Sequence, residues 1–161
     1  MFQLQRLALS TACLGIAAVP LLLAAAAQQK ETPPAKIAGV SLMPADALKW
    51  VPMPGLEGAQ QAALFGDPTK EAHRIFYKWS PGLTAPLHTH THGDRGVVIS
   101  GTLALAVEGA PAKKLGPGSY FSMAGGTKHV TSVDGDAPCV FYIEREGAFD
   151  AKMVEEKVER K

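Results

Sequence analysis

Residues 81–101 read PGLTAPLHTHTHGDRGVVISG and set three histidines, His88, His90 and His92, on alternate positions ahead of an apolar run. Side chains two residues apart on a β-strand point to the same face, roughly 7 Å apart along the strand. Two imidazoles arranged in this way can converge on one metal ion, and neutral imidazole suits zinc, copper, iron and nickel. The alternation has a second interpretation, an exposed strand that is polar on one side, and taken alone it does not choose between the two.

The residues around these histidines follow a longer spacing. Gly82, His88, His90, Asp94 and Gly101 fit the pattern G-x5-H-x-H-x3-D-x6-G. Glycine before the histidines marks a turn, where unusual backbone angles cost little. The spacing favours the metal-binding interpretation of the alternating histidines.

A second pattern lies further along the chain. Gly118, Gly126 and His129 fit the spacing G-x5-P-x-G-x2-H, with Ala124 in the place of the proline. In this order and at this separation, the two patterns resemble the two motifs of the cupin superfamily. The resemblance covers residues 74–144.

The resemblance implies an all-β fold, an antiparallel jelly-roll barrel of six to eight strands. It also implies that His88, His90 and His129 point inward and bind one divalent metal ion, which we expect to be iron, manganese, zinc or nickel. Asp94 stands at the fourth ligand position, where the family usually has glutamate. Small barrels can hold such an ion together with one small ligand.

The role of Asp94 stays open at this point, because its side chain is one methylene shorter than glutamate. It can coordinate the metal weakly, orient a ligand histidine from behind, or pair with the adjacent Arg95 at the surface. His92 is an alternative ligand that falls outside the motif. His73 lies outside both motifs, and we expect a surface histidine or one satisfied within the core.

Composition agrees with a turn-rich β fold in one domain. The 161 residues include 47% hydrophobic and 19% charged residues, with 16 glycines and 12 prolines. A net charge of +1 with no basic stripe gives no reason to expect nucleic-acid binding.

Alternation and turn signals predict strands at 74–79, 95–100, 102–107, 119–123, 129–133 and 139–144. On the first of these, Phe76 and Lys78 share one face, while Ile75, Tyr77 and Trp79 share the other; the sequence alone does not say which is inward.

The N-terminus predicts export. A short basic start, an uncharged run over 7–27 and small residues before Gln28 are typical of a secretory signal peptide. An uncleaved membrane anchor is the alternative. We therefore expect a signal peptide over 1–27, a linker or extended arm over 28–47, a barrel over 48–147 and a charged tail over 148–161. The tail forms either a short helix or a solvated charged segment.

Removal of residues 1–27 predicts a periplasmic or secreted protein with no stable membrane association. One cysteine, Cys139, would remain, so no internal disulfide can form. Its apolar neighbours predict a buried, inert thiol. Because open sheets carry unpaired edges, we expect a homodimer.

Three functions fit these features. The first is a metal-dependent enzyme that acts on a small molecule, as cupin dioxygenases do. The second is a non-enzymatic module that binds a small ligand or senses zinc or oxidants through the metal. The third is a metal-free structural barrel, which the intact set of three histidines disfavours. Cupins include enzymes and non-enzymes, so the fold does not decide, and the ligand histidines favour the enzyme.

Overall fold

A computed structural model describes residues 39–155 of the chain. The predicted signal peptide over 1–27, most of the predicted arm and the last six residues lie outside this described part. The elements described below all belong to one unit, which begins at Leu42. It begins with a short 3-10 helix, η1 (Ala45–Ala47). No helix between residues 39 and 155 is long and apolar enough to cross a membrane.

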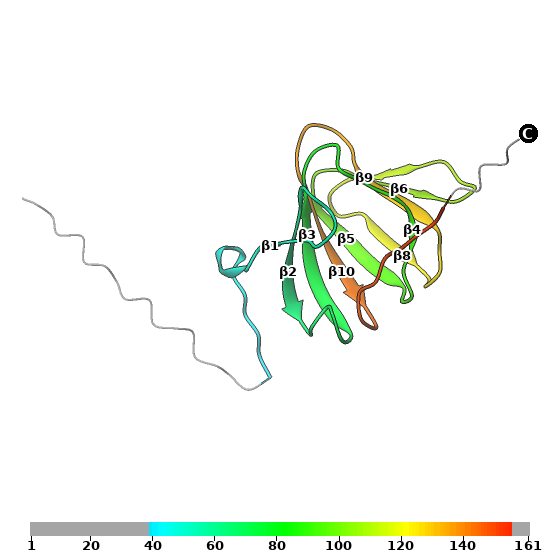
Figure 1. Cartoon of the computed structure of the whole chain (residues 1–161). Coiled ribbons are helices and arrows are strands. Elements are labelled where there is room, and N and C mark those ends of the chain that lie inside the picture. Colours follow the sequence, from blue (N-terminus) through cyan, green and yellow to red (C-terminus); the bar gives the residue numbers. More distant parts are fainter. Residues whose placement is uncertain (1–38, 156–161) are drawn as a thin grey trace, which may run out of the picture. The chain divides into compact units, whose positions relative to one another are not determined.

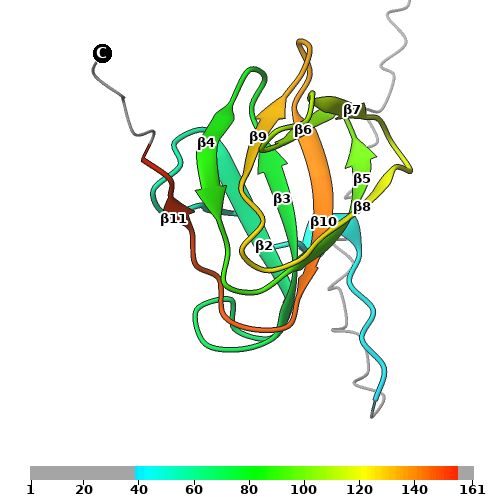
Figure 2. The same ribbon diagram turned by 90° about the vertical axis from the view of Figure 1, so that its right-hand side faces the viewer.

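Two antiparallel sheets form the body of this unit (Figures 1 and 2). In spatial order the six-stranded sheet holds β1 (Val51–Pro52), β2 (Ala59–Phe65), β3 (His73–Trp79), β10 (Cys139–Arg145), β5 (Asp94–Ser100) and β8 (Tyr120–Met123). The five-stranded sheet holds β11 (Lys152–Met153), β4 (Thr84–Thr89), β9 (His129–Val133), β6 (Leu103–Val107) and β7 (Lys113–Leu115). Most neighbours in space are not neighbours in sequence, as in a jelly roll. The predicted all-β jelly-roll fold is confirmed.

The core lies between the two sheets because the strands alternate. On β3, Ile75, Tyr77 and Trp79 are buried, whereas Phe76 and Lys78 are only half-buried, which identifies the inward face. The same alternation buries every second residue of β10, beginning with Cys139, whose free thiol is fully buried as predicted. Side chains from β5, β6 and β9 complete this core from both sheets. One wall of the unit therefore presents the odd-numbered residues of β3 and β10 to its interior.

All six predicted strands form, each within one residue of its expected ends. The prediction omitted β2, whose sequence AQQAALF is rich in alanine and glutamine and has no strict alternation of buried and exposed residues. Such a segment has low intrinsic β propensity. It forms a strand because it pairs along its length with β3.

The helix considered for the tail is not formed between Phe149 and Glu155. There the chain makes the two-residue strand β11, in which Met153 pairs with His88 and Lys152 with Thr89. Val154 adds a backbone hydrogen bond from its N–H to the carbonyl of Leu87. Hydrogen bonding to the free edge of β4 outweighs the local pattern of apolar and charged residues, so the tail becomes an edge strand beside the histidines.

Candidate metal centre

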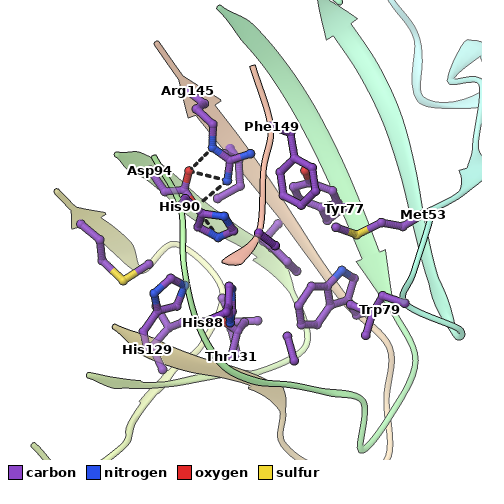
Figure 3. Close-up of a pocket in the computed structure, with 18 of the residues that line it drawn as sticks. Met53, Tyr77, Trp79, His88, His90, Asp94, His129, Thr131, Arg145 and Phe149 are labelled. Atoms are coloured by element: carbon purple, nitrogen blue, oxygen red, sulfur yellow. Dashed lines mark hydrogen bonds and ion pairs between the residues drawn. The ribbon is translucent and has the colours of Figure 1, made fainter. Parts of the chain in front are cut away.

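Three histidines from two neighbouring strands meet at one place inside the barrel (Figure 3). His88 lies near the end of β4, His129 begins β9, and these two residues are direct cross-strand partners. His90 directly follows β4. The ring centroids lie 4.2 Å apart for His88 and His129, 4.8 Å for His88 and His90, and 5.3 Å for His90 and His129. All three side chains are buried.

The donor nitrogens of these rings could share one ion. They lie within 4.8 Å of one another. Two nitrogens bound at about 2.1 Å to one tetrahedral ion lie about 3.4 Å apart. The most widely separated nitrogens must therefore approach each other by up to about 1.4 Å to share one ion, which modest rotations of the rings can supply. The structure brings the predicted trio together at one place.

Backbone carbonyls determine which nitrogen of each ring is free. Nδ1 of His88 lies 2.7 Å from the carbonyl oxygen of Pro86, and Nδ1 of His129 lies 2.9 Å from that of Thr127. Nδ1 of His90 contacts the carbonyl oxygen of Asp150. A carbonyl can only accept, so each Nδ1 carries the hydrogen and each Nε2 keeps its lone pair. This tautomer presents Nε2 to a metal and fixes the ring orientation.

Burial favours the neutral imidazole at His88 and His90. Loss of solvation lowers the pKa of His88 to about 4, outweighing the hydrogen bond to Pro86, which acts in the opposite direction. Burial likewise lowers the pKa of His90, against the opposing effect of the Asp94 carboxylate. Neutral imidazole is the form that binds metal, so at neutral pH little energy is needed to remove protons from His88 and His90.

Asp94 lies beside the histidines but is held by another residue. Its Oδ2 is 3.7 Å from Nε2 of His90. Arg145 Nε donates to Oδ1 at 2.6 Å and Arg145 Nη2 donates to Oδ2 at 2.8 Å, a bidentate pair in which both side chains are buried. The structure thus pairs Asp94 with Arg145, while Arg95 pairs at the surface with Glu146. Arg145 thus holds the Asp94 carboxylate by both oxygens, whereas each of the three imidazoles keeps a free Nε2.

A pocket of about 460 Å³ opens in front of the histidines. The five-stranded sheet contributes His88, His129 and Thr131, and the six-stranded sheet contributes Tyr77 and Trp79, on the other side of the pocket in Figure 3. Most of the remaining lining is apolar, namely Met53, Leu56, Ala85, Leu103, Leu105, Phe121, Met123, Phe141, Ile143, Phe149, Ala151 and Met153. A mainly apolar pocket with a few polar groups is suited to a small organic molecule.

The two other histidines between residues 39 and 155 stand apart from this centre. His92 follows the turn after β4, and its ring packs directly over the α-carbon of Gly147. His73 is fully buried on β3, with its Nδ1 3.0 Å from the carbonyl oxygen of Glu71. Neither belongs to the group of converging donors.

Sequence reasoning missed three residues that shape the centre: Arg145, Phe149 and Asp150. Phe149 lies between His90, at 5.6 Å between ring centroids, and the Arg145 guanidinium, 4.8 Å from its ring. The Asp150 carboxylate accepts hydrogen bonds from the N–H and hydroxyl of Thr91, which secures the segment whose carbonyl contacts His90. One signal was present: Arg145 continues the buried alternation of its strand, where a charge needs a buried partner.

Comparison with solved structures finds the same fold in proteins of low sequence identity. The polyketide cyclase RemF from Streptomyces resistomycificus has a TM-score of 0.61 and 17% identity, over 74% of this chain and 89% of its own. A cupin-2 domain from Rhodospirillum rubrum has a TM-score of 0.59 and 14% identity, over 72% and 81%. The DMSP lyase DddQ from Ruegeria pomeroyi has a TM-score of 0.57 and 19% identity, over 71% and 64%.

No curated protein matches the sequence. A family model described as "Domain of unknown function (DUF4437)" matches residues 11–152, which include both motifs and strands β1 to β10. The solved structures establish the cupin fold, and the family model establishes the closer relationship. The chain has the cupin fold and belongs to the DUF4437 family.

Proposed function

We propose that this chain binds one divalent metal ion through His88, His90 and His129 and catalyses a reaction of a small molecule in the adjoining pocket. The observation that carries the proposal is the convergence of three buried imidazoles, each with its Nδ1 bonded to a backbone carbonyl. Such bonds orient the free Nε2 atoms toward one point and increase their basicity.

A divalent ion held there would act as a Lewis acid toward an oxygen atom of the bound molecule or of water. The chain's own residues do the rest. Arg145 holds Asp94 away from the donor set, so three neutral nitrogens are available, and a site with three protein ligands keeps positions open for substrate. Phe149 and the apolar lining exclude water from the reacting molecule.

Two features support an enzyme. The pocket volume lies within the range of about 300–1,000 Å³ that small-molecule sites occupy. Enzymes of the same fold include a polyketide cyclase and a DMSP lyase. We propose oxygen-dependent chemistry of the dioxygenase type first, with iron, manganese, nickel or zinc as the metal to be identified.

Metal analysis of untagged protein tests the metal centre. We expect close to one equivalent of a divalent ion in the wild type and its loss in His88→Ala, His90→Ala and His129→Ala. His73→Ala, which removes an equally buried histidine outside the centre, is the matched control and should keep the metal. If His129→Ala retains full metal while His92→Ala loses it, the assignment of the three ligands is wrong.

Oxygen-uptake screening of the metal-loaded protein against small phenols, thiols and diketones tests the reaction. Uptake that depends on the three histidines supports the enzyme. Stoichiometric metal and ligand binding without turnover in a broader screen supports the alternative, a non-enzymatic binding or sensing module.

We also propose that the chain is exported to the periplasm or beyond and that its mature form begins near Gln28, because an uncharged run ends in small residues just before it. Mass spectrometry of the exported protein checks this, and an intact Met1 contradicts it.

We further propose a homodimer, since each sheet ends in strands without an outer neighbour among the described residues. Light scattering at high micromolar concentration should give twice the monomer mass; the monomer mass would exclude it.

A further inference from the structure

Three buried hydrogen-bond donors line the pocket without a partner among the described residues: Tyr77 Oη, Trp79 Nε1 and Arg145 Nη1. Each of these side chains is 5% exposed or less. Buried donors in folded proteins are almost always paired, so an unpaired one calls for an explanation. Three on one pocket wall indicate that the missing acceptors belong to a ligand.

These donors come from one sheet and face the metal centre. Tyr77 and Trp79 lie on β3 and Arg145 on β10, which are neighbouring strands of the six-stranded sheet. Figure 3 shows Tyr77 and Trp79 across the pocket from His88 and His129. A molecule in the pocket can therefore contact the donor wall on one side and the histidines on the other.

All three groups stay donors at neutral pH. Burial raises the pKa of the Tyr77 hydroxyl to about 12, although the nearby Arg145 guanidinium opposes this. The indole N–H of Trp79 can only donate, and so can the guanidinium of Arg145, whose Nε and Nη2 are already engaged with Asp94. The wall thus offers four hydrogens on three groups, because Nη1 carries two.

The number of acceptor sites distinguishes ligand classes. A carboxylate offers about four lone-pair sites on two oxygens, enough for three donors, whereas a single carbonyl oxygen offers two. An amide would also bring two further N–H donors to a wall that already has donors in excess. Hydrogen bonds to an ionised acceptor are roughly twice as strong as neutral ones. The rest of the lining is largely apolar, which suits a hydrocarbon body.

We infer that the pocket binds a small organic carboxylate with an aliphatic or aromatic body, and that donors of this wall, Tyr77 above all, hold the carboxylate group. This deepens the proposed function by naming its substrate class. It rests on that function only for the reacting end of the molecule, because the donor wall needs no metal.

Calorimetric titration with two matched pairs tests the inference: hexanoate against hexanamide, and phenylacetate against phenylacetamide. Each pair keeps the hydrocarbon body and changes the acceptor group. Titrations use metal-free protein and protein loaded with zinc. We expect each carboxylate to bind at least about 10-fold more tightly than its amide in both forms.

Substitutions locate the binding group. Tyr77→Phe and Trp79→Phe remove one donor each and should weaken carboxylate binding by about 3- to 12-fold, while amide binding changes less. Tyr142→Phe is the matched control, because Tyr142 lies on β10 but is half-buried and outside the pocket lining; it should leave the affinity unchanged. Absence of carboxylate binding, equal affinity for acid and amide, or unchanged affinity in Tyr77→Phe would overturn the inference.

The two proposals fail separately. If no preparation holds metal but carboxylates bind and depend on Tyr77, the metal-dependent function fails and the substrate class stands. If the protein holds one equivalent of metal and shows no preference for carboxylates, the substrate class fails and the metal centre stands.

Discussion

The buried ion pair between Arg145 and Asp94 can be broken by one substitution, Arg145→Met, which keeps a long apolar side chain and removes the charge. The Arg145 side chain is 1% exposed and that of Asp94 is 7% exposed, and their two hydrogen bonds measure 2.6 and 2.8 Å. Methionine leaves the carboxylate buried without a counter-charge. Breaking such a pair from one side typically costs about 3–5 kcal/mol of unfolding free energy.

We expect this loss to lower the melting temperature of metal-free protein by about 10–20 °C, since each kcal/mol corresponds to roughly 4 °C in a domain of about a hundred residues. Thermal unfolding followed by circular dichroism measures the shift. The double variant Asp94→Leu/Arg145→Met removes both charges and should recover much of the stability, which a double-mutant cycle would quantify. A melting temperature of Arg145→Met within about 3 °C of the wild type would refute the buried pair.

The same variant tests what Asp94 does toward a metal. Once released, the carboxylate lies 3.7 Å from Nε2 of His90, close enough to become a fourth ligand after a small rotation. Added zinc should therefore raise the melting temperature of Arg145→Met more than that of the wild type, because tighter binding to the folded state stabilises it further. An equal or smaller rise would show that Asp94 does not reach the ion even when free.

Three further variants or reagents test the surroundings of the pocket. Gly96→Ala should lower the unfolding free energy by about 1–3 kcal/mol in a denaturant titration, because the added methyl would overlap the Phe121 ring; wild-type stability would contradict the close packing there. Cys139 should react with a thiol reagent at pH 8 only after unfolding, in a variant lacking the other cysteine, because burial raises its pKa to about 11; rapid labelling of native protein would contradict this. Asp150→Ala should weaken zinc affinity by about 10-fold in a competition titration. The substitution removes the hydrogen bonds to Thr91 that fix residue 150, whose backbone carbonyl orients His90. Unchanged affinity would show that other contacts orient His90.

The two motifs predicted the three histidines that the structure brings together. His88 and His90 are two residues apart and were expected to share one face, whereas His129 was included because of the resemblance to the second cupin motif. The structure pairs His129 directly with His88. The six predicted strands follow from alternation and turns, which are local. For β3 the sequence predicted which residues share a face, and the structure added that the face with Tyr77 is the buried one.

The partner of Asp94 could not be predicted in this way. Arg145 lies 51 positions further along the chain, and the two meet only because β10 pairs with β5 in the register that sets them opposite each other. The sequence offered Arg95 as the nearest positive charge, but adjacent residues on a strand point to opposite faces. Register is a property of the whole sheet, so a residue can be assigned inward by alternation while its partner stays unknown.

That register and the chemistry of the site depend on each other. Arg145 pairs with Asp94 on one side and with His73 on the other, so the three buried residues form one row across β5, β10 and β3. A slip of β10 by one residue would turn Arg145 outward and bury Glu144 in its place, leaving two carboxylates without a cation inside the barrel. Because an unpaired buried charge costs several kcal/mol, the ion pair disfavours that slip. The pairing that engages the carboxylate beside His90 is thus also a pairing that keeps the sheet in register and holds Arg145 in the donor wall of the pocket.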